Sequence, residues 1–234
     1  MEENAKGERL VVAINGGPRK GWNTDTLLQR VLDGAKEAGA DTLCVDLYRL
    51  RYRGCVSCFA CKKEANYRRG ICVMRDELAG VLGILEGATG LVMGSPIYLG
   101  DVTGALRSFL ERYLFMNLVY GLDEPPVLER GPGIAMLYTM GVPESMLQEL
   151  GYDRLFASHL KILARLNAPF VESMVSCDTY QFKDYSKYHA PMFDEAHKAS
   201  VRATDFPRDL ERAFDIGKRL GSVTERPRRH VAAA

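Results

Sequence analysis

The sequence has no strong charge bias, no long apolar run and no internal repeat. Its 31 Lys and Arg residues nearly balance 30 Asp and Glu residues, so the net charge is +1. This balance gives no support to nucleic-acid binding. No run reaches the roughly 18 apolar residues that a membrane-spanning helix needs. The start, MEENAKGER, also lacks the basic-then-apolar order of a signal peptide. We therefore expect a cytoplasmic protein that binds neither membrane nor nucleic acid.

Two common nucleotide-binding motifs are absent as well. The glycine-rich stretch at 15–24 fits neither the G-x-G-x-x-G spacing nor the P-loop spacing. With 234 residues, of which 47% are hydrophobic, the chain can bury one large core. We predict a single domain over residues 1–222, with a cysteine-rich insertion at 54–73 and a disordered tail at 223–234.

What the sequence does contain is a regular alternation of short apolar runs and amphipathic segments. Strands are predicted at 10–14, 42–47, 89–93, 134–140 and 170–175. Helices are predicted after an N-cap at Asn23 or Thr24, over 76–85 and over 105–118. A long helical region is predicted to follow residues 141–144 and to end at about 166, and the last helix begins at about 205. This alternation is typical of a parallel sheet with helices on both faces. Five strands favour a flavodoxin-like α/β three-layer sandwich with strand order 2-1-3-4-5.

The predicted strand order places two glycine-rich loops side by side. Its switch point lies between the first and third strands, which end at the turn 15–24 and at the loop 94–104. Ligands of open α/β sheets bind at such a point. The first loop has the composition of a phosphate site at a helix N-terminus, although an ordinary strand-to-helix turn looks much the same.

Both loops resemble those of a known family. Residues 16–24, GGPRKGWNT, resemble the phosphate loop GSPRxxxNT of flavodoxin-like NAD(P)H-dependent FMN reductases. Residues 94–112 resemble that family's signature GSPxYxxxxTGxxKxFxDR, with Arg107 and Glu111 in place of Lys and Asp. The cysteines clustered after the second predicted strand resemble those of one branch of this family, the iron–sulfur flavoprotein-like (multimeric flavodoxin) group. The resemblance implies that the FMN phosphate is bound by Arg19, Asn23 and Thr24, with backbone help from Gly17 and Pro18. It also implies that the isoalloxazine is lined by Ser95, Pro96, Ile97 and Tyr98, while Gly100 keeps the approach to the ring open.

The resemblance also implies a function. It predicts an FMN-dependent oxidoreductase that passes electrons from NAD(P)H or a reduced carrier to a quinone, flavin or similar acceptor. The alternative is a non-enzymatic electron-transfer flavoprotein that serves a ferredoxin-like partner. Flavin supplies the redox chemistry, so we assign no catalytic side chain. We expect a homodimer or homotetramer, in which the aromatic segment 178–190 either contacts another subunit or wraps a neighbouring surface of its own chain.

Four of the six cysteines, Cys55, Cys58, Cys61 and Cys72, lie within 18 residues. The compact C-x2-C-x2-C part suits a [4Fe–4S] cluster, four thiolates also suit structural zinc, and free thiols are the third interpretation. We interpret Cys44 and Cys177 as structural residues.

Basic residues surround the four clustered cysteines. Such a charge run is commonly a solvated loop surface, but next to thiols we predict that it lowers their pKa values. The basic residues would also suit an acidic redox protein as partner. These residues are Arg49, Arg51, Arg53, Lys62, Lys63, Arg68 and Arg69.

Overall fold

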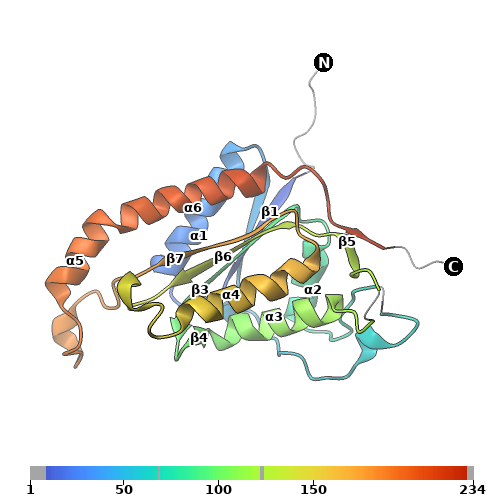
Figure 1. Cartoon of the computed structure of the whole chain (residues 1–234), viewed down its shortest axis with the longest axis horizontal. Helices are drawn as coiled ribbons and strands as arrows, with labels where there is room; N and C mark the ends of the chain where they lie inside the picture. Colours follow the sequence, from blue (N-terminus) through green and yellow to red (C-terminus); the bar gives the residue numbers. More distant parts are fainter. Residues whose placement is uncertain (1–8, 68, 122–123, 231–234) are drawn as a thin grey trace, which may run out of the picture.

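The computed structural model describes residues 9–67, 69–121 and 124–230, and a parallel sheet runs through its centre (Figure 1). The strands follow the order β2 (Asp41–Asp46), β1 (Leu10–Asn15), β3 (Gly90–Tyr98), β6 (Gly133–Thr139) and β7 (Val171–Ser176). All four pairings in this path are parallel. The predicted flavodoxin-like order is therefore confirmed, with the switch point between β1 and β3.

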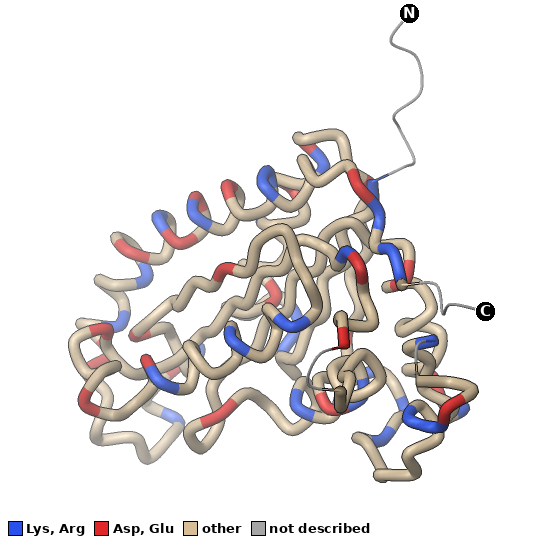
Figure 2. Tube along the Cα trace, turned by 45° about the vertical axis from the view of Figure 1, so that its right-hand side comes forward, with Lys and Arg blue, Asp and Glu red and all other residues tan. Residues whose placement is uncertain are grey.

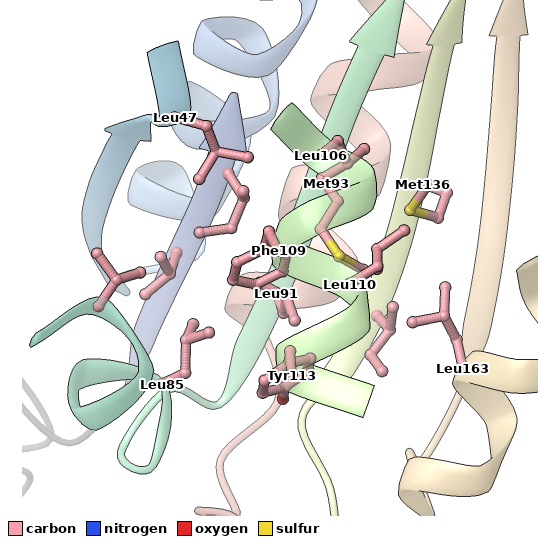
Figure 3. Packing of buried hydrophobic residues seen from close by; sticks show 14 of the residues in the cluster. Leu47, Leu85, Leu91, Met93, Leu106, Phe109, Leu110, Tyr113, Met136 and Leu163 are labelled. Carbon is pink, nitrogen blue, oxygen red and sulfur yellow. The ribbon is translucent and has the colours of Figure 1, made fainter. Parts of the chain in front are cut away.

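Helices cover both faces of the sheet. α1 (Asn23–Glu37) and α6 (Phe206–Gly221) pack on one face, where their apolar residues join one buried cluster with β1, β3 and β6. α2 (Glu77–Leu85), α3 (Gly104–Asn117) and α4 (Tyr152–Leu163) contribute to a second cluster on the other face. Figure 3 shows Leu106, Phe109 and Leu110 of α3 packed near Leu91 and Met93 of β3. This packing fixes α3 on the sheet, next to the loop 94–104 at whose end the helix begins.

Short 3₁₀ segments interrupt or extend several predicted elements. The long helical region predicted to end near Leu166 is divided in the structure, and Gly151, with φ +75°, precedes α4. The 3₁₀ segments are Leu47–Arg49, Ala60–Lys62, Glu144–Met146, Ala164–Leu166 and Tyr185–Lys187. Within the described residues, no helix combines the length and apolar character needed to cross a membrane.

One helix and three short strands were not predicted, the third strand being the two-residue β4 (Asp101–Val102). α5 (Glu195–Thr204) leads into α6 at Asp205, and both helices carry basic and acidic residues (Figure 2). β5 (Leu128–Arg130) pairs antiparallel with β8 (Arg228–Arg229). β8 lies within the tail 223–234 for which disorder was predicted, and its Arg229 donates to Asn117 Oδ1 and to Gly70 O. Residues 231–234 and Arg68 lie outside the described residues.

Glycines allow α1 and α6 to pack very closely. A Cβ at Gly217 would lie 1.9 Å from the carbonyl oxygen of Val31, and one at Gly34 would lie 2.0 Å from that of Phe214. Because α1 begins at the glycine-rich turn, this contact also sets the position of that turn.

Candidate cofactor sites

Hydrogen bonds join the loops that follow β1 and β3. Gly16 donates its N–H to Gly94 O at 2.8 Å, and Thr103 Oγ1 donates to Gly16 O at 2.7 Å. Thr103 is also the N-cap of α3, where its Oγ1 accepts from Leu106 N. On the other side, the hydroxyls of Thr24 and Thr139 lie 2.7 Å apart. The ends of β1, β3 and β6 are thereby connected, as the strand order predicts.

Two buried polar residues hold the glycine-rich turn in shape. Asn15 Oδ1 accepts from Gly17 N at 2.9 Å, while its Nδ2 donates to Asp25 Oδ1 and Asp46 Oδ1. The second oxygen of Asp25 accepts from Gly21 N at 2.6 Å. The sequence did not predict that Asn15 and Asp25 hold this turn, because their hydrogen bonds are made to residues that only folding brings close.

The first turn of α1 has the features of an anion site. Trp22, rather than the predicted Asn23 or Thr24, is the N-cap, and its side chain offers the helix no acceptor. In the described part of the chain, the buried indole Nε1 of Trp22 has no hydrogen-bond partner. The Arg19 guanidinium lies 4.5 Å from the centre of the Trp22 ring. A helix N-terminus, an unpaired N–H and a cation together fit a phosphate group.

The loop predicted to contact the isoalloxazine is a tight hairpin. β4 (Asp101–Val102) pairs antiparallel with Ile97 and Tyr98 at the end of β3. Both turn residues have positive φ, 51° at Leu99 and 88° at Gly100, as a type I′ turn requires. Gly100 therefore serves the turn conformation.

The structure brings eight of the ten predicted FMN residues to one cleft. It does not bring Ser95 and Gly100 there: Ser95 is buried and its Oγ accepts from Thr103 N. The predicted residues in the cleft are Gly17, Pro18, Arg19, Asn23, Thr24, Pro96, Ile97 and Tyr98. The lining residues that sequence reasoning missed are Trp22, Thr139, Met140, Gly141, Thr179, Tyr180 and Gln181.

A segment that follows β7 covers this cleft. Arg19 Nη1 donates to Gln181 O at 2.7 Å, and Asn23 Nδ2 donates to Tyr180 O at 2.8 Å. Arg202 of α5 in turn donates to Asn23 Oδ1 at 3.0 Å. The remaining free volume is about 40 Å³, well below the 300–1,000 Å³ usual for ligand pockets. A ligand of ordinary cofactor size would enter this cleft only if the segment at 180–181 moved.

The base of this covering segment is fixed by buried charges. Lys198, 3% exposed, donates Nζ to Gly141 O at 2.8 Å and also to the carboxylate of Asp178. The other oxygen of Asp178 pairs with His197 Nε2 at 2.5 Å. Phe182 stacks on Tyr188 and meets Tyr185 edge-on. In the described residues, then, the aromatic segment packs on its own chain.

The four clustered cysteines line a second, small pocket next to the C-terminal half of α3. Cys55, Cys58, Cys61 and Cys72 share this pocket with Phe115, Met116 and Arg112. Cys58 is exposed, whereas Cys61 is buried. Cys55 N donates to Glu111 Oε2, and Lys62 donates Nζ to the carbonyls of Phe115 and Leu118. The cysteine loop is thereby attached to α3.

Among the described residues, a single group of three or more candidate metal ligands lies within 4.8 Å of one another, and it consists of Asp25, Cys44 and Asp46. No three of the four loop cysteines are that close to one another.

The thiol pKa values differ from the prediction. Burial raises the pKa of Cys61 more than the neighbouring Lys62 lowers it, so the expected depression is wrong at this residue. Burial, Asp46 and Asp25 raise the pKa of Cys44 to about 11. Burial, together with nearby carboxylates, raises the pKa of Cys177 to about 12. Protonated thiols at both positions agree with structural roles.

A third, wider cleft of about 430 Å³ lies between α3, α4 and the cysteine loop. Leu110, Leu114 and Leu163 contribute to its apolar wall, and Arg107 and Arg165 also line it. Sequence reasoning gave no sign of this cleft, because its walls come from helices distant in the chain.

Comparison with known proteins identifies the family. The family described as NADPH-dependent FMN reductase matches residues 10–142. The chain belongs to this family. FMN is accordingly the cofactor that the family's loops accommodate, and the predicted recognition is confirmed.

The curated relatives that the chain matches include iron–sulfur flavoproteins. An iron–sulfur flavoprotein of Methanocaldococcus jannaschii is 31% identical over 102 residues, which cover 44% of this chain and 50% of that protein. An iron–sulfur flavoprotein of Archaeoglobus fulgidus is 32% identical over 102 residues, covering 44% and 47%. The chain thus spans about half the length of the curated relatives it matches.

Solved structures show the same fold at lower identity. An NAD(P)H:quinone oxidoreductase from Methanothermobacter marburgensis superposes with a TM-score of 0.64 at 16% identity, covering 91% of this chain and 97% of that one. An azoreductase from Bacillus anthracis gives a TM-score of 0.61 at 17% identity, covering 90% and 99%.

Proposed function

We propose that this protein is an FMN-dependent oxidoreductase that takes electrons from NAD(P)H or a reduced carrier and delivers them to a quinone, flavin or similar acceptor. The observation that carries this proposal is the meeting of the 15–24 turn, the hairpin at 95–102 and the end of β6 around one cleft. Solved structures of this fold include a quinone oxidoreductase and azoreductases, which supports small redox acceptors.

The phosphate of FMN would be bound by the first turn of α1, Arg19 and Asn23, with Trp22 Nε1 as a further donor. Arg19 and Asn23 currently bond to the carbonyls of Gln181 and Tyr180. We infer that they exchange these carbonyls for phosphate oxygens as the covering segment moves. The hairpin residues Pro96, Ile97 and Tyr98 would contact the ring. Bound flavin supplies the hydride and electron chemistry, and the protein supplies binding, orientation and exclusion of water.

We further propose that Cys55, Cys58, Cys61 and Cys72 hold a [4Fe–4S] cluster. Their common pocket, the C-x2-C-x2-C spacing of three of them in the sequence and the names of the iron–sulfur flavoprotein relatives support this assignment. The exposed Cys58 would bring the cluster close to the surface, where a one-electron partner could dock. The basic residues of the loop suit an acidic redox protein, and such association weakens as salt rises. A homo-oligomeric state and a cytoplasmic location stay predictions.

Anaerobic reduction tests the main proposal. Adding NADH or NADPH to the FMN-loaded protein should bleach the flavin absorbance, and adding a quinone should restore it. If neither nucleotide bleaches the flavin but a reduced ferredoxin does, the protein is an electron carrier rather than a reductase. If FMN does not bind at all, both assignments are wrong.

A further inference from the structure

Arg112 is a fully buried arginine beside the four cysteines. It lies on α3 and is 1% exposed. Its Nη1 donates to Asp76 Oδ2 at 2.6 Å and to Arg53 O at 3.3 Å, and its Nη2 donates to Met74 O at 3.5 Å. Its guanidinium group therefore holds together the two ends of the chain segment that contains all four cysteines.

The hydrogen bonds around Arg112 are incomplete. In the described part of the chain, neither its Nε nor Asp76 Oδ1 has a hydrogen-bond partner, and both atoms are buried. A buried donor without a partner is costly, and more so when it belongs to a charged group. Such a donor in a pocket lined by four cysteines points to an acceptor that binds there.

Arg112 also lines the same pocket as the four cysteines, Cys72 among them. An arginine side chain keeps its positive charge in proteins. Arg112 is thus a permanent cation beside the proposed ligands. The other cations of this loop differ: Lys62 is bonded to two carbonyls of α3, and the side chain of Arg51 is 93% exposed, where salt screens its charge.

We propose that Arg112 is a positioning residue of the cysteine site, which holds the two ends of the cysteine segment together and supplies a positive charge and a free N–H to a sulfur-ligated iron cluster. This inference rests on the proposed [4Fe–4S] assignment. Net charge and hydrogen bonds to sulfur help to set the reduction potential of such clusters. A buried cation stabilises the more negative, reduced form, so Arg112 raises the potential and Asp76 partly offsets this effect.

Two substitutions should therefore shift the potential in opposite directions. Arg112→Gln removes the charge and should lower the ratio of reduced to oxidised cluster at least tenfold at the wild-type midpoint, because tenfold is already the effect of one unit charge roughly 12 Å away at an effective dielectric constant of about 20. For one electron, tenfold corresponds to about 59 mV. Asp76→Asn keeps the arginine and removes its counter-charge, so it should raise that ratio. A purely structural contact would not produce shifts of opposite sign.

The experiment uses anaerobically purified protein with its native cofactors. Iron per chain, FMN per chain and the cluster midpoint from a redox titration are measured for the wild type and both variants. Arg107→Gln is the matched control, because Arg107 lies on the same helix with its side chain 54% exposed and only a 3.9 Å contact to Asp101. The control should leave the cluster midpoint unchanged.

The outcomes separate the two proposals. Wild-type protein without iron overturns the cluster assignment and this inference together. Wild-type protein with iron, combined with unchanged midpoints in both variants, overturns the role of Arg112 alone. If Arg112→Gln also loses FMN and therefore its fold, the isosteric Asp76→Asn variant decides, and a midpoint at or below the wild-type value refutes the inference.

Discussion

The packing of α6 on α1 gives a quantitative test of how the cofactor turn is positioned. At Gly217, an added Cβ would lie 1.9 Å from Val31 O and 3.0 Å from Ala35 N. Because ordinary carbon contacts lie near 3.5 Å, the two helices would have to separate by roughly 1.5 Å. Overpacking of this kind costs about 1–3 kcal/mol, and backbone atoms in the contact favour the upper end. Alanine regains about 1 kcal/mol of helix propensity, so Gly217→Ala should destabilise the protein by about 2 kcal/mol.

Gly80 of α2 provides the matched control. A Cβ at Gly80 meets no atom within 4 Å, so Gly80→Ala should stabilise the protein by about 1 kcal/mol through propensity alone. At about 2–4 °C per kcal/mol for a chain of this size, Tm should fall by roughly 4–8 °C for Gly217→Ala and rise by roughly 2–4 °C for Gly80→Ala.

Thermal and urea unfolding, followed by far-UV circular dichroism, measure both changes. FMN affinity should fall in Gly217→Ala as well, because α1 carries the glycine-rich turn, and stay unchanged in Gly80→Ala. Equal stability changes of the same sign for the two variants would refute the close helix contact.

Three further changes test other parts of the structure. Thr24→Val leaves the buried Thr139 hydroxyl without its partner at 2.7 Å, so urea unfolding should show a loss of about 1–3 kcal/mol, and an unchanged stability would exclude this hydrogen bond. Burial lowers the pKa of His159 below 6.5 despite the opposing effect of Asp101. Because the unfolded state then binds the proton more readily, the free energy of unfolding should fall as the pH drops below 6.5. His159→Gln should weaken this pH dependence, and an unchanged pH dependence would argue against a neutral His159. Lys62→Met removes two hydrogen bonds between the cysteine loop and α3, so iron release to a chelator should accelerate, whereas the same change at the exposed Lys63 should have no effect.

The strands and the strand order could be predicted because the core-forming segments are strongly apolar. β1 and β6 consist almost entirely of buried residues, and such runs suit strands covered on both faces. The eight cleft residues were predictable for a different reason, since they belong to two local loops with recognisable patterns.

The elements that were missed carry weak local signals. α5 has the sequence EAHKASVRAT, in which Lys198 is the buried residue, so its pattern lacks an apolar stripe. β8 is an Arg-Arg pair that is ordered by contacts with distant residues. Sequence reasoning also read Arg112 only as part of a family signature, because its burial and unpaired Nε arise from packing between α3 and the cysteine loop.

The central claim is that one chain carries an FMN site and an iron–sulfur site. Cofactor content and the visible spectrum of anaerobically purified protein test it most directly. We predict one FMN and about four irons per chain, with a brown protein whose flavin bands bleach on reduction. A protein that binds FMN but holds no iron after anaerobic reconstitution would contradict the cysteine assignment, and one that binds neither would contradict the account as a whole.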